Sequence, residues 1–169
     1  LSFFEADLLV DGSYDVAAAS SDAIIHIASP FTLRYKNAEL DLIRPAVEGT
    51  KNVLNAANRS STVKKVVLTS SIAAVYGDNA DLKDLNTEEF TEELFNHSST
   101  SRHQPYSYSK LLAEKEAWNM FSMQKKWELV VINPTLVMGP SLSVNSNSES
   151  LKIMNDLLRG WYRAGVPAL

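Results

Sequence analysis

Three short runs of apolar, largely β-branched residues constrain the fold of this chain most. They span residues 23–28, 66–68 and 129–132, and they are apolar throughout rather than alternating. Such runs are typical of strands in a parallel sheet that is covered on both faces. Stretches with helical periodicity, from about residue 38 to 58 and from about 106 to 123, separate them. This alternation predicts an α/β fold built on a parallel sheet.

Shorter elements are expected between and beyond these segments. Residues 3–8 are expected to form the end of a further strand, and Ser13 is expected to cap a short helix that follows it. Residues 87–95 could form one helix within an otherwise polar and irregular stretch, and a last helix is expected over 150–159. These elements complete the predicted alternation of strands and helices.

Length, charge and composition narrow the class of protein. The 169 residues fit one domain, 1–169, with a core of useful size. The net charge is −4 and the basic residues are scattered, so a nucleic acid is not expected as a partner. No apolar run is long enough for a membrane span, so no membrane association is expected. The chain has no cysteine and no metal-ligand spacing, so we expect no metal site and a reducing compartment, the cytoplasm.

Small or polar residues follow every expected strand. Asp7, Ser29, Thr69–Ser71 and Asn133 stand at these four ends. The carboxyl ends of parallel strands meet at one edge of the sheet, and open α/β sheets bind their ligands there. A polar turn after one strand is ordinary, whereas four at the same edge indicate a binding site.

Tyr106 and Lys110 form the sharpest candidate pair for catalysis. Four residues apart on a helix, their side chains share one face. A nearby ammonium group lowers the pKa of a phenol from its usual value of about 10. Such a tyrosine can give a proton to a carbonyl oxygen, or take it back. A chance pair on a surface helix would have the same spacing, but Pro105 opens this helix and Ser71 ends the preceding strand, where its hydroxyl could bind the same oxygen.

Three longer segments, 67–77, 105–114 and 133–140, extend these features. With 26–30 and 43–50, they resemble the successive signatures of the extended short-chain dehydrogenases/reductases. Within that family the chain is most similar to the branch of dihydroflavonol reductases and cinnamoyl-CoA reductases. The resemblance implies a Rossmann-type, doubly wound parallel sheet. It also implies an oxidoreductase that reduces the carbonyl group of an aldehyde, a ketone or a flavonoid-like small molecule.

Carried over position by position, the resemblance implies the catalytic roles. Tyr106 is the general acid/base, Lys110 lowers its pKa and binds the nicotinamide ribose, and Ser71 orients the substrate oxygen. Asp7 and Leu8 would hold the adenine end of the cofactor. Further cofactor contacts are implied for Ile27, Ala28 and Ser29 on the ribose and pyrophosphate side, for Thr69, Pro134 and Val137 around the nicotinamide, and for Ser150.

The implied cofactor is NADP(H) rather than NAD(H). The glycine-rich turn that would cradle its pyrophosphate is not found in the sequence, and we expect it upstream of Leu1. The expected sheet is therefore partial and lacks the first βαβ unit, and the substrate lobe is expected beyond Leu169. By itself, the 169-residue chain is expected to be a poor enzyme.

Two other functions share these residues. A nucleotide-sugar epimerase or dehydratase uses the same serine, tyrosine and lysine, although Arg44-Pro45 and residues 148–150 favour a reductase. A non-catalytic Rossmann-like binding fragment is the second alternative, and the presence of Tyr106 and Lys110 argues against it for the whole protein. A hydrolase triad is disfavoured because the sequence has no Gly-x-Ser-x-Gly elbow.

Overall fold

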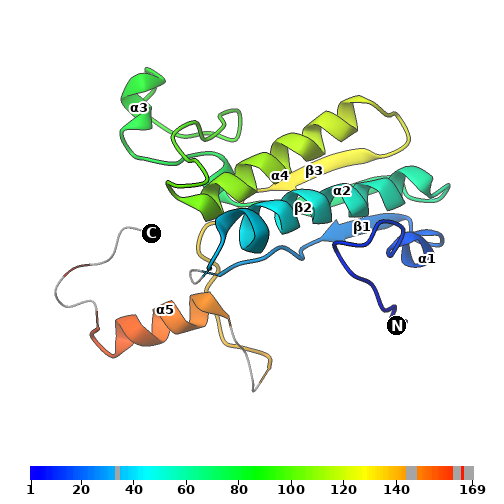
Figure 1. The fold of residues 1–169 in the computed structure, drawn as a ribbon, viewed down its shortest axis with the longest axis horizontal. Coiled ribbons are helices and arrows are strands. Elements are labelled where there is room, and N and C mark those ends of the chain that lie inside the picture. The colour runs from blue at the N-terminus through cyan, green and yellow to red at the C-terminus, as the bar shows by residue number, and fades with distance from the viewer. Residues whose placement is uncertain (33–34, 144–147, 162–164, 166–169) are drawn as a thin grey trace. The chain divides into compact units, whose positions relative to one another are not determined.

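Three parallel strands form the sheet that the apolar runs predict. They are β1 (Ala23–His26), β2 (Lys65–Thr69) and β3 (Glu128–Ile132), hydrogen-bonded in that order (Figure 1). The structure is a computed structural model that describes residues 1–32, 35–143, 148–161 and 165. It divides into two units, residues 1–134 and 135–169, and each is described by itself. All three strands belong to the first unit, whose sheet and helices confirm the α/β, Rossmann-type fold.

Two long helices connect the strands. Helix α2 (Arg44–Arg59) follows a turn of π-helix, η1 (Glu39–Ile43), and joins β1 to β2, whereas α4 (Pro105–Ser122) joins β2 to β3. Each carries a proline in its first turn, where the missing N–H leaves no helical hydrogen bond unmade. Helix α4 matches its predicted segment to within one residue at each end, and α2 matches its own when η1 is counted with it.

Shorter elements complete the two units. In the first unit they are α1 (Asp15–Ala18), a 3₁₀ turn η2 (Ile72–Ala74) and α3 (Asp81–Asp84). In the second unit, α5 (Glu149–Leu158) confirms the helix expected over 150–159. The 3₁₀ turn follows directly on β2, and its first residues therefore lie at the carboxyl edge of the sheet.

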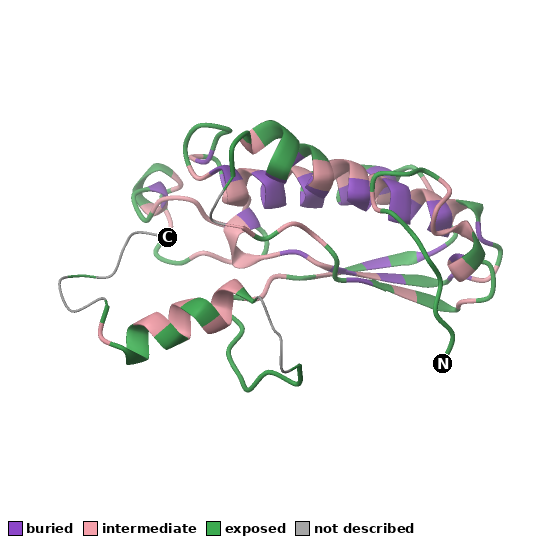
Figure 2. Cartoon of the chain, turned by 60° about the horizontal axis from the view of Figure 1, so that its bottom comes forward, coloured by how far each residue is buried: buried purple, intermediate pink, exposed green. Residues whose placement is uncertain are grey.

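The core lies between the sheet and the two long helices. Strand register places Ile24, Val66 and Leu129 side by side on one face. The helices cover this face with buried residues such as Leu54 of α2 and Ala117 of α4 (Figure 2). Alanine allows close approach, so α4 lies against the strands. The buried residues shown in Figure 2 gather along this contact.

The opposite face of the sheet differs from expectation. Ile25 is 67% exposed and Ile132 is 48% exposed, and Val130, which pairs with Val67 in the register, is exposed as well. The apolar runs predicted strands covered on both faces, but in the described residues burial is confined to the side of α2 and α4. Apolar composition alone cannot tell whether the second face is covered, because it reports hydrophobicity and not the identity of the neighbouring element.

Three short predictions are wrong. Residues 3–8 form no strand in the structure, and residues 87–95 form no helix. Ser13 does not cap α1; its hydroxyl instead accepts a 2.6 Å hydrogen bond from the Asp7 amide. The loop that contains residues 3–8 is held instead by the Ser13 hydroxyl and by the Asn52 side chain, which donates to the Leu8 carbonyl oxygen at 2.7 Å. In residues 87–95 the Thr87 hydroxyl forms local hydrogen bonds with Glu89, an alternative to helical bonding.

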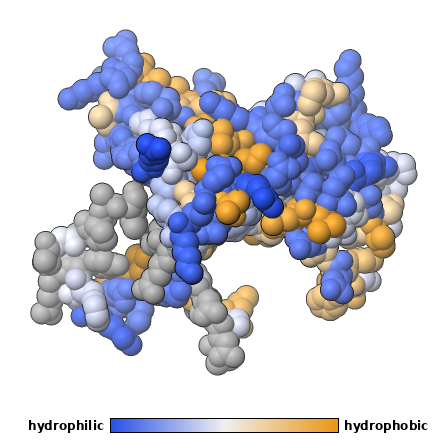
Figure 3. Space-filling model, viewed as in Figure 1, coloured by the Kyte–Doolittle hydropathy of each residue, from blue (hydrophilic) through white to orange (hydrophobic). Residues whose placement is uncertain are grey.

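The outer surface of the helix layer faces water. In Figure 3, which shows the side on which α2 and α4 lie in front, hydrophilic side chains dominate and the hydrophobic ones form scattered patches. Across the part of the chain that the structure describes, no helix combines the length and the apolar character needed to cross a membrane.

Replacing Leu54 by alanine tests the core. Leu54 is fully buried between α2 and the sheet, so Leu54→Ala should lower the free energy of unfolding by about 2–5 kcal/mol, through lost burial and the cavity left behind. Leu40→Ala, at a site 54% exposed, should change it by less than about 1 kcal/mol. Urea unfolding measures both, and equal losses would contradict this placement of the core.

Candidate active site

The carboxyl ends of β2 and β3 meet at one edge of the sheet. The Ser70 amide donates to the Ile132 carbonyl oxygen at 2.8 Å, and the Ile72 amide donates to the Pro134 carbonyl oxygen at 3.0 Å. These bonds extend the pairing of the two strands past their formal ends and hold Ser71 between them. The first turn of α4, with Tyr106, lies over this edge, where the Ser71 hydroxyl is close enough to Tyr106 to lower its pKa.

The structure brings Tyr106, Ser71 and Lys110 together. Lys110 Nζ lies 5.9 Å from the centre of the Tyr106 ring, and Phe31 packs on the same ring with centroids 4.8 Å apart. Ser71 caps the 3₁₀ turn, since its Oγ accepts from the Ala73 amide at 3.2 Å. The Ser71 hydroxyl hydrogen is therefore free to point to the phenol oxygen. The three side chains predicted as catalytic share one site.

The pKa of Tyr106 shifts in the opposite direction from the one predicted. Burial of the half-buried ring raises its pKa above the usual 10.0, and the hydrogen bond with Ser71 lowers it only in part. The charge of Lys110, which was predicted to lower the pKa of Tyr106, does not determine the direction of the shift. The phenol therefore stays protonated at neutral pH, the form that donates a proton.

Lys110 is buried, with 7% of its surface exposed. Burial without a countercharge lowers its pKa from 10.5 to about 8. In the described part of the chain no carboxylate comes within ion-pair distance of its Nζ. The ammonium group lines a small cavity that also contains Ser70, whose Oγ has no hydrogen-bond partner among the described residues.

His26 lines the same cavity and is buried. It stands on the helix-facing side of β1, paired in register with Leu68. Burial, together with the positive charge of Lys110, lowers its pKa from 6.5 to about 4. The imidazole is therefore neutral at physiological pH.

A second, larger hollow adjoins this cavity at Ala28, which lines both. It has a volume of about 670 Å³ and is lined by Asp7 and Leu8 among others. The Asn52 side-chain amide donates to the Leu8 carbonyl oxygen at 2.7 Å and fixes this loop on α2. A side chain at Gly49 would press on Leu8 at 3.2 Å, so glycine allows the loop to lie close to the helix. Two predicted cofactor residues thus line a hollow next to the candidate catalytic set.

The other predicted cofactor residues lie at different places in the structure. Ser29 and Thr69 line the small cavity beside Lys110, and Pro134 is joined to the 3₁₀ turn through its carbonyl oxygen. Ile27 follows β1 with its side chain 67% exposed. Val137 and Ser150 belong to the second unit, so their predicted roles stay predictions.

Two asparagines to which the sequence analysis gave no role in the site hold the serine and the turn that follows it. Asn96, 1% exposed, donates from Nδ2 to the Ala73 and Tyr76 carbonyl oxygens at 2.9 and 3.1 Å. Asn133 was noted only as a polar strand end, yet its Nδ2 donates to the Ser71 carbonyl oxygen at 3.1 Å and to Glu114 at 2.8 Å. The one available signal was the position of Asn133, directly before Pro134 at a strand end.

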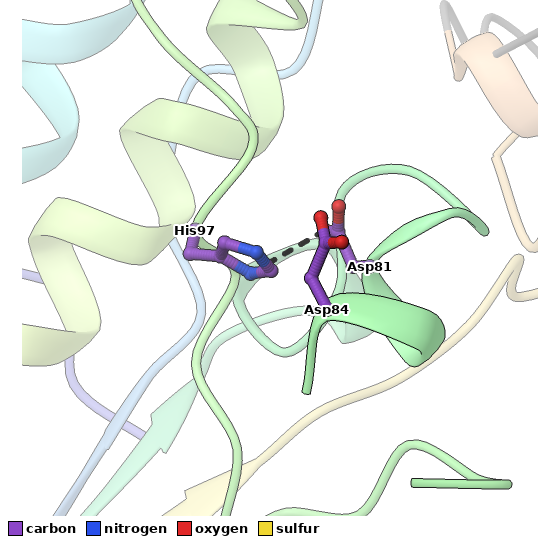
Figure 4. A group of neighbouring side chains, drawn as sticks. All are labelled: Asp81, Asp84 and His97. Atoms are coloured by element: carbon purple, nitrogen blue, oxygen red, sulfur yellow. Dashed lines mark ion pairs between the residues drawn. The ribbon is translucent and has the colours of Figure 1, made fainter. Parts of the chain in front are cut away.

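Asp81, Asp84 and His97 form a cluster outside this site (Figure 4). Each offers an atom within 4.8 Å of the others, and His97 Nδ1 lies 3.7 Å from Asp81 Oδ2. The buried Asp81 carboxylate already accepts from Ser98 Oγ at 2.7 Å and from the Asp78 amide at 3.2 Å. These contacts give the cluster a structural role, because they tie the loop around residue 98 to α3.

Comparison with known proteins adds a family and several relatives. Residues 1–165 match the model of the NAD dependent epimerase/dehydratase family. The chain is 39% identical to a cinnamoyl-CoA reductase, CAD2, of Medicago truncatula over 92% of its own length. It is 36% identical to an anthocyanidin reductase of Vitis vinifera over 95% of its own length. Each alignment covers 47% of the relative, so the chain spans about half the length of these proteins.

A solved structure shares both fold and sequence with the chain. The yeast methylglyoxal/isovaleraldehyde reductase Gre2, complexed with NADPH, superimposes with a TM-score of 0.79 at 29% sequence identity. The match covers 96% of this chain and 52% of the yeast protein. These similarities agree with the reductase branch that the sequence motifs resemble.

The low pKa of His26 predicts a loss of stability in acid. The unfolded chain takes up this proton near pH 6.5 and the folded chain only near pH 4, so stability falls as the pH is lowered between these values. The full difference between these two pKa values corresponds to about 3 kcal/mol of unfolding free energy. His26→Asn should remove most of this loss, measured by urea unfolding at pH 7 and pH 4.5.

His103→Asn is the matched control, because that histidine is largely exposed. Between pH 7 and pH 4.5, His103→Asn should lose about as much unfolding free energy as the unmodified protein. The two losses should differ by no more than about 1 kcal/mol, the scale of an exposed ion pair. An acid loss in His26→Asn as large as in the unmodified protein would show that His26 does not titrate as its burial requires.

Proposed function

The chain belongs to the NAD dependent epimerase/dehydratase family, and on this premise we propose that the protein is an NADPH-dependent reductase of small-molecule carbonyl compounds. Aldehydes, ketones and flavonoid-like compounds are the substrate class we propose. The relatives that carry reductase names support reduction over epimerisation. Because the chain spans about half of their length, the proposal concerns the full-length protein.

One observation carries the proposal: a protonated tyrosine, a serine hydroxyl and a buried ammonium group meet at the carboxyl edge of a parallel sheet. The Ser71 hydroxyl lies close enough to Tyr106 to lower its pKa, and Lys110 Nζ lies 5.9 Å from the centre of the Tyr106 ring. This edge is where α/β sheets bind their ligands. The set can hold a carbonyl oxygen, protonate it and stabilise the negative charge that results.

The chain's own residues would manage the proton. NADPH, when bound, supplies the hydride that the carbonyl carbon accepts. The Tyr106 phenol gives its proton to the carbonyl oxygen, so that an alcohol and a phenolate result. Ser71 donates a hydrogen bond to the substrate oxygen or to the phenolate. The Lys110 ammonium group stabilises the phenolate by its charge until solvent returns a proton.

The hollow next to Ala28 suits one end of a dinucleotide in size and position. Asp7 and Leu8 would contact the adenosine part, and Ser29 and Thr69 would continue the path towards Lys110. The residues lining the hollow include no lysine or arginine in the described part of the chain. A cation that reads the 2′-phosphate must therefore come from elsewhere, and the preference for NADPH rests on the yeast relative.

Replacing Tyr106 by phenylalanine in the full-length protein tests the general acid. Tyr106→Phe should lower kcat by about a hundredfold or more, because the carbonyl oxygen loses its proton donor. Tyr108→Phe is the matched control on the same helix, since no lysine follows it four residues on. NADPH oxidation with an aldehyde or ketone panel measures both, and similar losses would reject the assignment.

Lys110 gives a prediction with a defined pH dependence. Its ammonium group is present below its pKa of about 8 and is lost above it, so the affinity for NADPH should fall as the pH rises from 7 to 9. Lys110→Met should weaken binding by about tenfold or more at pH 7, the scale of a hydrogen bond from a charged group, and should flatten this dependence.

Calorimetric titration with NADPH at several pH values measures the effect. Lys115→Met, which removes an exposed lysine of the same helix, should bind as the unmodified protein does. A pH dependence that survives in Lys110→Met would assign it to another group.

A further inference from the structure

Glu114 is a buried carboxylate that the mechanism above does not use. It lies one turn after Lys110 on α4 and is 4% exposed. Its Oε2 accepts from Asn133 Nδ2 at 2.8 Å, and its Oε1 accepts from Trp118 Nε1 at 3.4 Å. A buried carboxylate is costly unless it is hydrogen-bonded, so these two donors fix where it can lie.

Asn133 joins this carboxylate to the serine. The same Nδ2 donates to the Ser71 carbonyl oxygen at 3.1 Å. A carboxylate and a carbonyl are both acceptors only, so the NH₂ end of the amide must face both, with one hydrogen for each. The amide orientation is therefore determined, and a continuous link runs from α4 through the end of β3 to the backbone of Ser71.

This link adds a side-chain hydrogen bond to the peptide group between Ser71 and Ile72, which backbone bonds also hold. The amides of Ser70 and Ile72 donate to Ile132 and Pro134. The Ser71 carbonyl oxygen accepts from the Ala74 amide within the 3₁₀ turn at 2.9 Å, and from Asn133 Nδ2, which ties it to β3, at 3.1 Å. Rotation of this peptide plane would move the Ser71 hydroxyl, which also caps the 3₁₀ turn through the Ala73 amide. A shift of about 1 Å in a reacting group can cost about a hundredfold in rate.

We propose that Glu114 is a positioning residue for Ser71, acting through Asn133. The proposal rests on the proposed reductase function for its effect on rate, but the link itself is a property of the fold. Glu114 also lines the cavity next to Lys110 without forming an ion pair to it among the described contacts. The proposal therefore assigns its effect to the hydrogen bond and not to its charge.

Activity measurements on the full-length protein separate the effect of the Glu114 hydrogen bond from the effect of its charge. Glu114→Met should lower kcat about tenfold with little change in KM for NADPH, because the serine is displaced and the cofactor contacts are kept. Glu114→Gln keeps an acceptor for Asn133 without the charge, so it should restore most of the rate. Glu116→Met, two residues along the same helix, is the control and should act as the unmodified protein does. Failure of glutamine to rescue would overturn the proposal.

A double-mutant cycle tests the route through the serine. If Glu114 acts through Ser71, then Glu114→Met should lower the rate less than about twofold in a Ser71→Ala background. If Glu114→Met lowers the rate by the same factor with and without Ser71→Ala, then Glu114 does not act through Ser71. Asn133→Leu breaks the same link from its other end, so it should show the same loss and serves in place of Glu114→Met if that variant does not fold.

Hydrogen exchange gives a readout that needs no turnover. The Ile72 and Ala73 amides donate to Pro134 O and Ser71 Oγ, bonds that depend on the orientation of this turn. Glu114→Met should speed their exchange about tenfold relative to Glu114→Gln, while Glu116→Met leaves it unchanged. Unchanged exchange overturns the positioning role. If the full-length protein reduces no carbonyl compound, the proposed function fails, and exchange still decides whether the link exists.

Discussion

The packing of α4 on the parallel sheet is the contact on which the rest of the site depends. Ala117 is fully buried and Ala113 nearly so, and these small side chains let the helix lie directly on the strands. This close approach places Tyr106 over the ends of β2 and β3. It also removes Lys110 and Glu114 from water, although both carry ionisable groups. One row of alanines thus sets the position and the electrostatic environment of the candidate site.

Burial, rather than contact between neighbouring charges, governs the ionisation of this site. It raises the pKa of Tyr106 and lowers those of Lys110 and His26. Lys110 and His26 have no countercharge among the described residues that would compensate, whereas the Glu114 carboxylate has two hydrogen-bond donors. The arrangement favours a protonated phenol and a neutral imidazole at physiological pH. A site of this kind is set up to donate a proton.

The sheet shows how far periodicity alone can be trusted. The strands lie where their apolar runs predicted, because β-branched residues favour extended backbone whatever covers them. Whether both faces are covered depends on which elements pack there, and Ile25 and Ile132 are exposed in the described structure. The segment 3–8 was apolar enough for a strand, but it makes no ladder pairing and its loop is held by Ser13 and Asn52.

The sequence by itself determined what is local: three strands, two long helices begun by prolines, and the spacing that puts Tyr106 and Lys110 on one helix face. It also placed Ser71 at a strand end, because strand length and polar turns can be read along the chain. Only the tertiary structure joined Glu114, Asn133 and Ser71, which are separated by tens of residues. It also decided the direction of the Tyr106 pKa, since desolvation depends on every neighbour in space and a spacing along a helix reports only one of them.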